Sequence, residues 1–183
     1  SDQRKLWYIS IKQKEPFAPG PSKLATYFRV DPHIIRRSLV QARKATKNSK
    51  LIEMQFKIIH RILACNEYLH RTKIRNDSFC NSCQSHDDLE HFLFACPQTH
   101  AFWEQLVIHY NQIQNTNLLL DFKTIILGPK PSNKLLVGLI LHGKWYIYSS
   151  KIATSPISFD SFLVKLQYYL LVEKMGILIN PLN

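Results

Sequence analysis

Three of the chain's four cysteines and two of its eight histidines fall within the seventeen residues CNSCQSHDDLEHFLFAC. Their spacing is Cys80-x2-Cys83-x7-His91-x4-Cys96. Two thiolates separated by two residues can bind one ion from a tight turn, and a second pair completes a tetrahedron. Three sulfurs and one nitrogen suit Zn²⁺, which is borderline soft and redox-silent. The sequence therefore predicts a structural zinc site at Cys80, Cys83, His91 and Cys96.

Other interpretations of the same cysteines fit the sequence less well. A redox Cys-x-x-Cys is normally found at a strand-to-helix junction, and no such pattern surrounds Cys80. A disulfide needs an oxidising compartment and would leave an odd cysteine. A catalytic zinc keeps one position open for water, whereas four ligands here would fill its shell. One alternative stays open, in which His86 replaces His91 as the nitrogen ligand.

The residues around the second ligand pair predict its local structure. The segment DDLEHFLFACP, residues 87–97, reads as one or two helical turns that Pro97 ends. Because the residue before a proline avoids the α-helical region, we expect Cys96 to turn back towards His91. The pair Asp87 and Asp88 is interpreted as a solvated acidic turn.

No catalytic constellation stands out elsewhere in the sequence, so we expect that this fragment is not an enzyme. The chain has no glycine-rich phosphate loop and no recognisable nucleophile elbow. A nuclease would need a carboxylate pair with a nearby lysine, for which Asp160, Glu173 and Lys174 are the only loose candidates.

The elements that must position these residues read as helices. Asp31 and Pro32 form a helix-start signature, and a long central helix with a broad apolar surface is expected to bury Cys65. Ser132 and Ser158 are expected to be the N-caps of the last two helices. The predicted helices cover residues 31–47, 49–73, 99–113, 118–127 (ended by Gly128), 133–152 and 159–177.

The predicted fold class is mostly α: a helical domain with a small Cys-Cys-His-Cys (CCHC), zinc-stapled loop-helix insertion. No strand-rich block or internal repeat is visible, and the apolar fraction of 45% is typical of a globular chain. No apolar run is long enough to cross a bilayer. Three parts are expected: a basic arm and first helix (1–50), a CCHC zinc-binding module with flanking helices (51–110), and a C-terminal helical part of the same compact unit (111–183).

The net charge of +11 is concentrated ahead of the cysteine cluster. Residues 1–75 hold 17 Lys/Arg against 5 Asp/Glu, while residues 76–183 hold 7 against 8. This asymmetry favours a polyanionic partner, nucleic acid first and an anionic membrane surface second, over a basic face kept only for solubility. The residues predicted to contact nucleic acid are Arg36, Arg37, Arg43, Lys44, Lys47, His60, Arg61, Arg71, Lys73 and Arg75.

The first thirty residues read as an extended arm, because EPFAPGPSK holds three prolines and a glycine. The chain opens with Ser1 and shows no charged-then-apolar leader, so we expect a piece of a longer polypeptide without a signal peptide. The basic and aromatic residues of the arm suit either a nucleic-acid groove or attachment to the core.

The cysteine region and its flanks resemble a known family. FKIIHRILACNEYLHR, the Cys-x2-Cys pair, LEHFLFACP and the following FW are similar to the zinc-binding region after the reverse transcriptase of LINE-type non-LTR retrotransposon polyproteins. The likeness is strong over residues 51–105 and looser to residue 183. It covers Lys57, His60 and Arg61 on the preceding helix, the four cysteine and histidine ligands, and Glu90, Pro97 and Trp103 around them.

This resemblance implies a C-terminal domain that binds RNA, target DNA or both, and supports target-primed reverse transcription. The parent polyprotein would be an RNA-directed DNA polymerase. It would be intracellular, in the nucleus and the cytoplasm, as part of a ribonucleoprotein. Its reverse transcriptase domain is a further expected partner, while neither a membrane nor a small-molecule substrate is expected. The alternative is a zinc-stapled helical interaction module that docks the polymerase body or an acidic protein.

Overall fold

The computed structural model describes residues 27–179, with side chains up to residue 172. Most of the predicted extended arm therefore lies outside the described residues. Its last aromatic residues, Tyr27 and Phe28, contact the folded part of the chain. Phe28 packs against the core, and the Arg61 guanidinium lies 3.8 Å from the centre of the Tyr27 ring.

The first two helices begin at polar caps that the sequence provides. Helix α3 (Pro32–Ala45) is preceded by Asp31, whose carboxylate accepts a hydrogen bond of 2.8 Å from the His33 N–H. The predicted start at Asp31 and Pro32 is thus confirmed. Helix α4 (Ser49–Ile59) is capped by Asn48. Each helix buries one face, as a period of 3.6 residues allows; the buried face of α3 includes the polar residues Ser38 and Gln41.

The long central helix predicted from the apolar pattern is two helices, so that prediction was wrong. After α4 the chain adopts a left-handed conformation at Arg61, with φ of 54°, and the Ile62 N–H donates to the Lys57 carbonyl at 2.9 Å. This is a Schellman closure, which ends a helix by satisfying its last carbonyls. Helix α5 (Asn66–Arg71) then follows, and Cys65 is buried as expected, but at its N-terminal cap.

The remaining helices agree with the sequence pattern, with shifts at their ends. Ser158 lies at the start of the last helix, where its Oγ accepts from the Ser161 N–H. Asn133, rather than Ser132, caps the helix before it, because the Asn133 side chain accepts from the Leu136 N–H at 3.1 Å. These four helices are α6 (Pro97–Gln114), α7 (Phe122–Leu127), α8 (Lys134–Ile152) and α9 (Phe159–Ile179).

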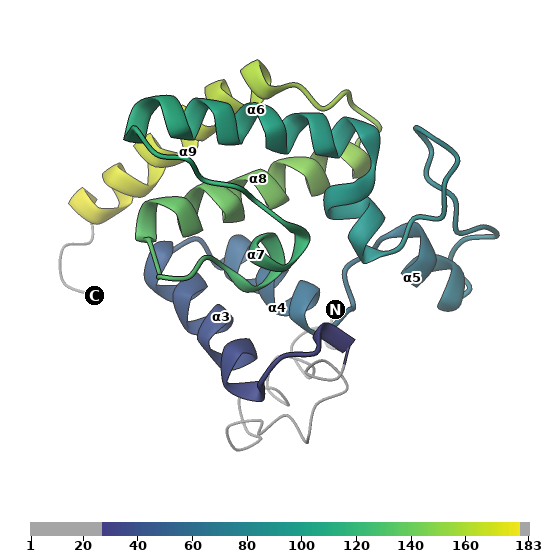
Figure 1. Cartoon of the computed structure of the whole chain (residues 1–183). Coiled ribbons are helices and arrows are strands. Elements are labelled where there is room, and N and C mark those ends of the chain that lie inside the picture. The colour runs from purple at the N-terminus through teal and green to yellow at the C-terminus, as the bar shows by residue number, and fades with distance from the viewer. Residues whose placement is uncertain (1–26, 180–183) are drawn as a thin grey trace.

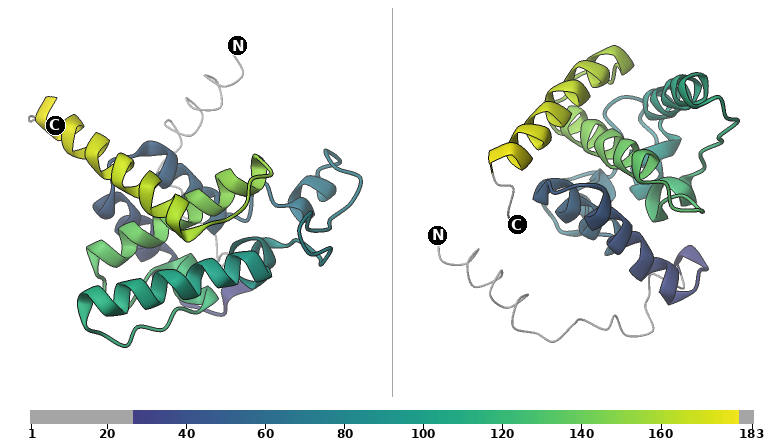
Figure 2. Two further views of the ribbon diagram at one scale, coloured as in Figure 1. Left: turned by 90° about the horizontal axis from the view of Figure 1, so that it is seen from above. Right: turned by 90° about the vertical axis from the view of Figure 1, so that its left-hand side faces the viewer.

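Helix α8 lies at the centre of the molecule. Helices α3, α4 and α7 pack on one side of it, and α6 and α9 lie on the other (Figures 1 and 2). One hydrophobic cluster joins the described helices, from Ile35 of α3 to Leu166 of α9. Helix α5 and the loop after it project from this body at the right of Figure 1.

The predicted mostly helical class, with a Cys/His loop-helix insertion, is confirmed over residues 27–179. In that range the structure has no β-strand, only an isolated bridge between Phe79 and His86. Among the described residues no helix is both long and apolar enough to cross a membrane. The three-part division of the chain stays a prediction.

Candidate metal centre

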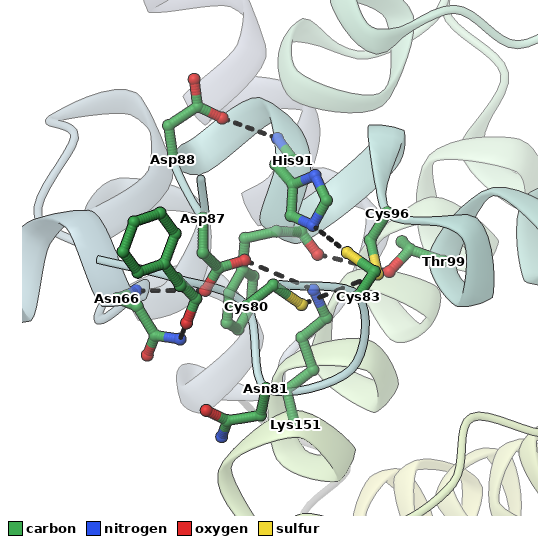
Figure 3. A network of polar contacts seen from close by, with 12 residues as sticks. Asn66, Cys80, Asn81, Cys83, Asp87, Asp88, His91, Cys96, Thr99 and Lys151 are labelled. Carbon is green, nitrogen blue, oxygen red and sulfur yellow. Dashed lines mark hydrogen bonds and ion pairs between the residues drawn. The ribbon is translucent and has the colours of Figure 1, made fainter. Parts of the chain in front are cut away.

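The first ligand pair lies on a tight turn within residues 72–90, which we call the metal loop. The Phe79–His86 bridge closes this turn, and the Cys80 N–H donates to the Ser85 carbonyl at 2.8 Å. Gln84 adopts a left-handed conformation with φ of 60°. The chain therefore reverses directly after Cys83, and both thiols point to the same side of the turn (Figure 3).

The second ligand pair is brought together by one turn of π-helix, η1 (His91–Ala95). The Cys96 N–H donates to the carbonyl of His91 at 3.0 Å, which is the five-residue hydrogen bond of a π-turn. Asp88 accepts from the His91 N–H at 2.7 Å and fixes the start of the turn. Pro97 ends it, and Cys96 is extended, with φ of −60° and ψ of 132°, as the sequence predicted. A regular α-helix would place His91 and Cys96 on different faces.

The four predicted ligands converge on one point. Their ligand atoms all lie within 4.8 Å of one another, with Cys80 Sγ 3.9 Å from Cys96 Sγ and Cys83 Sγ 3.2 Å from His91 Nε2 (Figure 3). Tetrahedral coordination at usual zinc bond lengths needs about 3.8 Å between two sulfurs and about 3.6 Å between sulfur and nitrogen. Cys80, Cys83, His91 and Cys96 are thus positioned to bind a metal ion, and their donor set fits zinc.

The surroundings of the ligands act on their protonation in different directions. Burial lowers the pKa of His91, helped by the Lys151 charge, so its imidazole favours the neutral form that binds metals. For Cys83, desolvation raises the thiol pKa, but hydrogen bonds with Ser85, Cys80 and Cys96 outweigh it, and the pKa is lowered. Burial raises the pKa of Cys80, and the charge of a bound ion would favour the thiolate form of this side chain.

The alternative nitrogen ligand lies outside the cluster. His86 is exposed, and its Nδ1 lies 3.1 Å from the Ser78 Oγ across the loop. The cluster of possible ligands contains His91 and not His86. The structure therefore favours His91 as the nitrogen ligand.

Two charged residues beside the cluster were not found by sequence reasoning. Asp87, expected to be solvated, is only 2% exposed, and its Oδ2 accepts from the Asn66 N–H at 3.2 Å. Its Oδ1 lies 3.7 Å from the Nζ of Lys151, on the last turn of α8. No local pattern marks this pair, because its members are distant in sequence and meet only in the folded chain.

The residues predicted to contact nucleic acid fall into two groups. Four are half-buried: Arg37, His60, Arg61 and Arg75. Of these, His60 packs against Phe56, and Arg75 binds the side chains of Asn66 and Asn81, so it holds the metal loop. The other six are exposed: Arg36, Arg43, Lys44, Lys47, Arg71 and Lys73.

The exposed group is itself divided between two places. Arg36, Arg43 and Lys44 lie on α3, and Lys47 directly after it, whereas Arg71 and Lys73 lie at the end of α5. Helices α3 and α5 lie on opposite sides of the molecule in Figure 1. The ten predicted residues therefore do not form one continuous surface.

Fold and site together define a mostly helical domain with a Cys₃His cluster that is positioned to bind a metal ion. Comparison with protein-family models and with curated proteins found no match for this chain.

Proposed function

We propose that this chain is a zinc-stabilised nucleic-acid-binding domain, from the C-terminal region of a LINE-type non-LTR retrotransposon polyprotein. It contacts RNA, target DNA or both and supports target-primed reverse transcription, while the polymerase activity resides in another part of the polypeptide. The sequence resemblance around the ligands supports the family, and the convergence of the four ligand atoms supports the zinc.

The exposed basic face of α3 is the observation that carries the binding proposal. Arg36 and Arg43 lie two turns apart on one side of the helix, about 10 Å along its axis, with Lys44 beside them and Lys47 beyond the end. All four side chains are exposed, and none forms an ion pair with a described residue. Cations without acidic partners on one face suit the phosphates of a nucleic acid and give affinity with little base discrimination.

Zinc has a separate task in this proposal. The metal loop contributes little to the hydrophobic core, because Leu89 is its only apolar residue there apart from Cys80. Coordination therefore supplies the ordering that burial of apolar surface gives elsewhere. It fixes α5, with Arg71 and Lys73, relative to the helical body, so a second basic site is held at a constant position.

The test is a set of binding titrations with single-stranded RNA, single-stranded DNA and duplex DNA over a range of salt concentrations. The variant carries glutamine at Arg36, Arg43, Lys44 and Lys47, and a second variant carries R71Q and K73Q. The matched control carries glutamine at four exposed lysines elsewhere: Lys123, Lys130, Lys134 and Lys165.

We expect the α3 variant to reduce the slope of log K against log salt by roughly 0.7 to 0.9 for each phosphate that is no longer neutralised. The α5 variant should reduce the slope by the equivalent of up to two phosphates, and the control should change it little. Equal effects of the α3 variant and the control would mean that only net charge matters. Absence of binding at low salt would reject the nucleic-acid role itself.

One observation favours the alternative role, docking on the polymerase body of the same polypeptide. Helix α9 carries an exposed apolar stripe formed by Val164, Tyr168 and Leu171, which are 68%, 65% and 60% exposed. Such a stripe is suited to a protein partner rather than to phosphates. If the chain does not bind nucleic acid but co-purifies with the polymerase domain, and V164S/L171S abolishes this, docking is the function.

A further inference from the structure

Lys151 is a buried cation beside the candidate metal centre. Its side chain is only 11% exposed and extends from the last turn of α8 into the wall of a cleft of about 500 Å³, which Cys80 also lines. The Nζ atom is buried and has no hydrogen-bond partner among the described residues. An ammonium group in such a place needs a compensating negative charge.

The groups around Lys151 show where that charge lies. The ammonium is 3.7 Å from Asp87 Oδ1, which is longer than a hydrogen bond, and 4.5 Å from the centre of the Phe92 ring. Figure 3 shows it pointing towards the cluster, beside Cys80. The Asp87 oxygen that faces Lys151 has no hydrogen bond of its own among the described residues, because the Asn66 N–H donates to the other oxygen, Oδ2.

The charges of a loaded site explain the arrangement. Zinc with three thiolates and one neutral imidazole carries a net charge of −1, and the buried Asp87 carboxylate adds another. Two negative charges in a buried region are costly unless a cation offsets them. Lys151 is placed to do so, and it comes from the helical core rather than from the metal loop.

We infer that Lys151 is the counter-ion of the metal centre: a positioning residue whose charge favours the metal-bound thiolates and links the metal loop to α8. The inference rests on the proposed zinc and goes beyond the four ligands. A positive charge at this place offsets the net negative charge of the loaded centre, so its removal should speed loss of the ion.

The test measures zinc transfer from the loaded chain to an excess of a chromogenic chelator at neutral pH. K151M and K151Q remove the charge, K151R keeps it, and K134M is the control, because it removes an exposed charge at the other end of the same helix. We expect transfer to be about tenfold faster or more in K151M and K151Q, and close to wild type in K151R and K134M.

Cobalt(II) provides a readout that loss of structure alone would not move. Without the cation the thiolate electrons are held less tightly, so the thiolate-to-cobalt absorption band should shift to longer wavelength in K151M and K151Q but not in K151R. If K151M and K134M behave alike in both measurements, the inference is overturned while zinc binding stands. If the wild-type chain binds neither zinc nor cobalt, both the role of Lys151 and the proposed zinc site are overturned. Failure to bind nucleic acid would overturn only the proposed function.

Discussion

Two glycines of helix α8, Gly138 and Gly143, give a matched pair of positions for testing how the core supports the candidate metal centre. A methyl group at Gly143 would lie 2.8 Å from Trp103 Cη2 and 3.0 Å from its Cζ3, whereas one at Gly138 meets nothing within 4 Å. The Trp103 ring cannot move aside easily, since it is 2% exposed and its Nε1–H donates to the Leu93 carbonyl of η1 at 2.7 Å. Replacing Gly143 with alanine therefore forces a clash or breaks a buried hydrogen bond.

The magnitude follows from two opposing effects. Alanine favours a helix over glycine by about 1 kcal/mol, and Gly138→Ala should gain most of this. At Gly143 the same gain is opposed by overpacking, which costs about 1–3 kcal/mol. We expect Gly143→Ala to be less stable than Gly138→Ala by about 2 kcal/mol, close to a thirtyfold change in the unfolding equilibrium.

Urea unfolding of the zinc-loaded variants, followed by tryptophan fluorescence and circular dichroism, measures this difference. The slope m should stay constant, so that the midpoint alone reports the free energy of unfolding. Because Leu93 lies within η1, Gly143→Ala should also release zinc faster than Gly138→Ala. If Gly143→Ala proves as stable as Gly138→Ala, the close contact with Trp103 does not restrain the helix.

Three further measurements test other parts of the structure. Burial lowers the pKa of Lys144 to about 7, so the stability of the wild type should rise with pH between about 7 and 10.5 by up to roughly 1.4 kcal/mol per unit, and Lys144→Met should remove this rise. His91→Ala should abolish the tetrahedral cobalt(II) spectrum, and His86→Ala should leave it unchanged. The reverse result would mean that His86, and not His91, is the nitrogen ligand. Asp121→Ala removes the cap of α7 and should cost about 1 kcal/mol in thermal unfolding; since the Thr124 hydrogen bond lowers the Asp121 pKa, this cost should disappear at acidic pH.

Local chemistry explains which features could be predicted from the sequence. The start of α3 depends on Asp31 and Pro32 themselves, and the ligand set depends on a local spacing of cysteine and histidine that can be read from the sequence. The end of α4 depends on Arg61 in a left-handed conformation, where glycine would normally mark the stop. An arginine gives no such signal, so the apolar pattern alone predicts one long helix.

Features that arise from tertiary contacts could not be predicted in this way. The sequence favours a solvated Asp87 because acidic pairs usually are solvated, yet it is buried against the start of α5 and the end of α8. The charge of Arg75 suggests a phosphate contact, and the structure places its side chain on two asparagines of the same region. For both Asp87 and Arg75, the residues contacted in the folded chain determine the role of the side chain, and the residue type alone does not reveal it.

The π-helical turn at His91–Ala95 has a consequence for how this domain can vary. A turn of this kind holds one more residue than an α-turn and has poorer hydrogen-bond geometry, so a deletion of one residue would make a better helix. Binding of the proposed zinc would oppose that deletion, because the deletion would rotate Cys96 relative to His91 by about 100°. We therefore expect this one-residue deletion only in chains that have also lost the metal ligands.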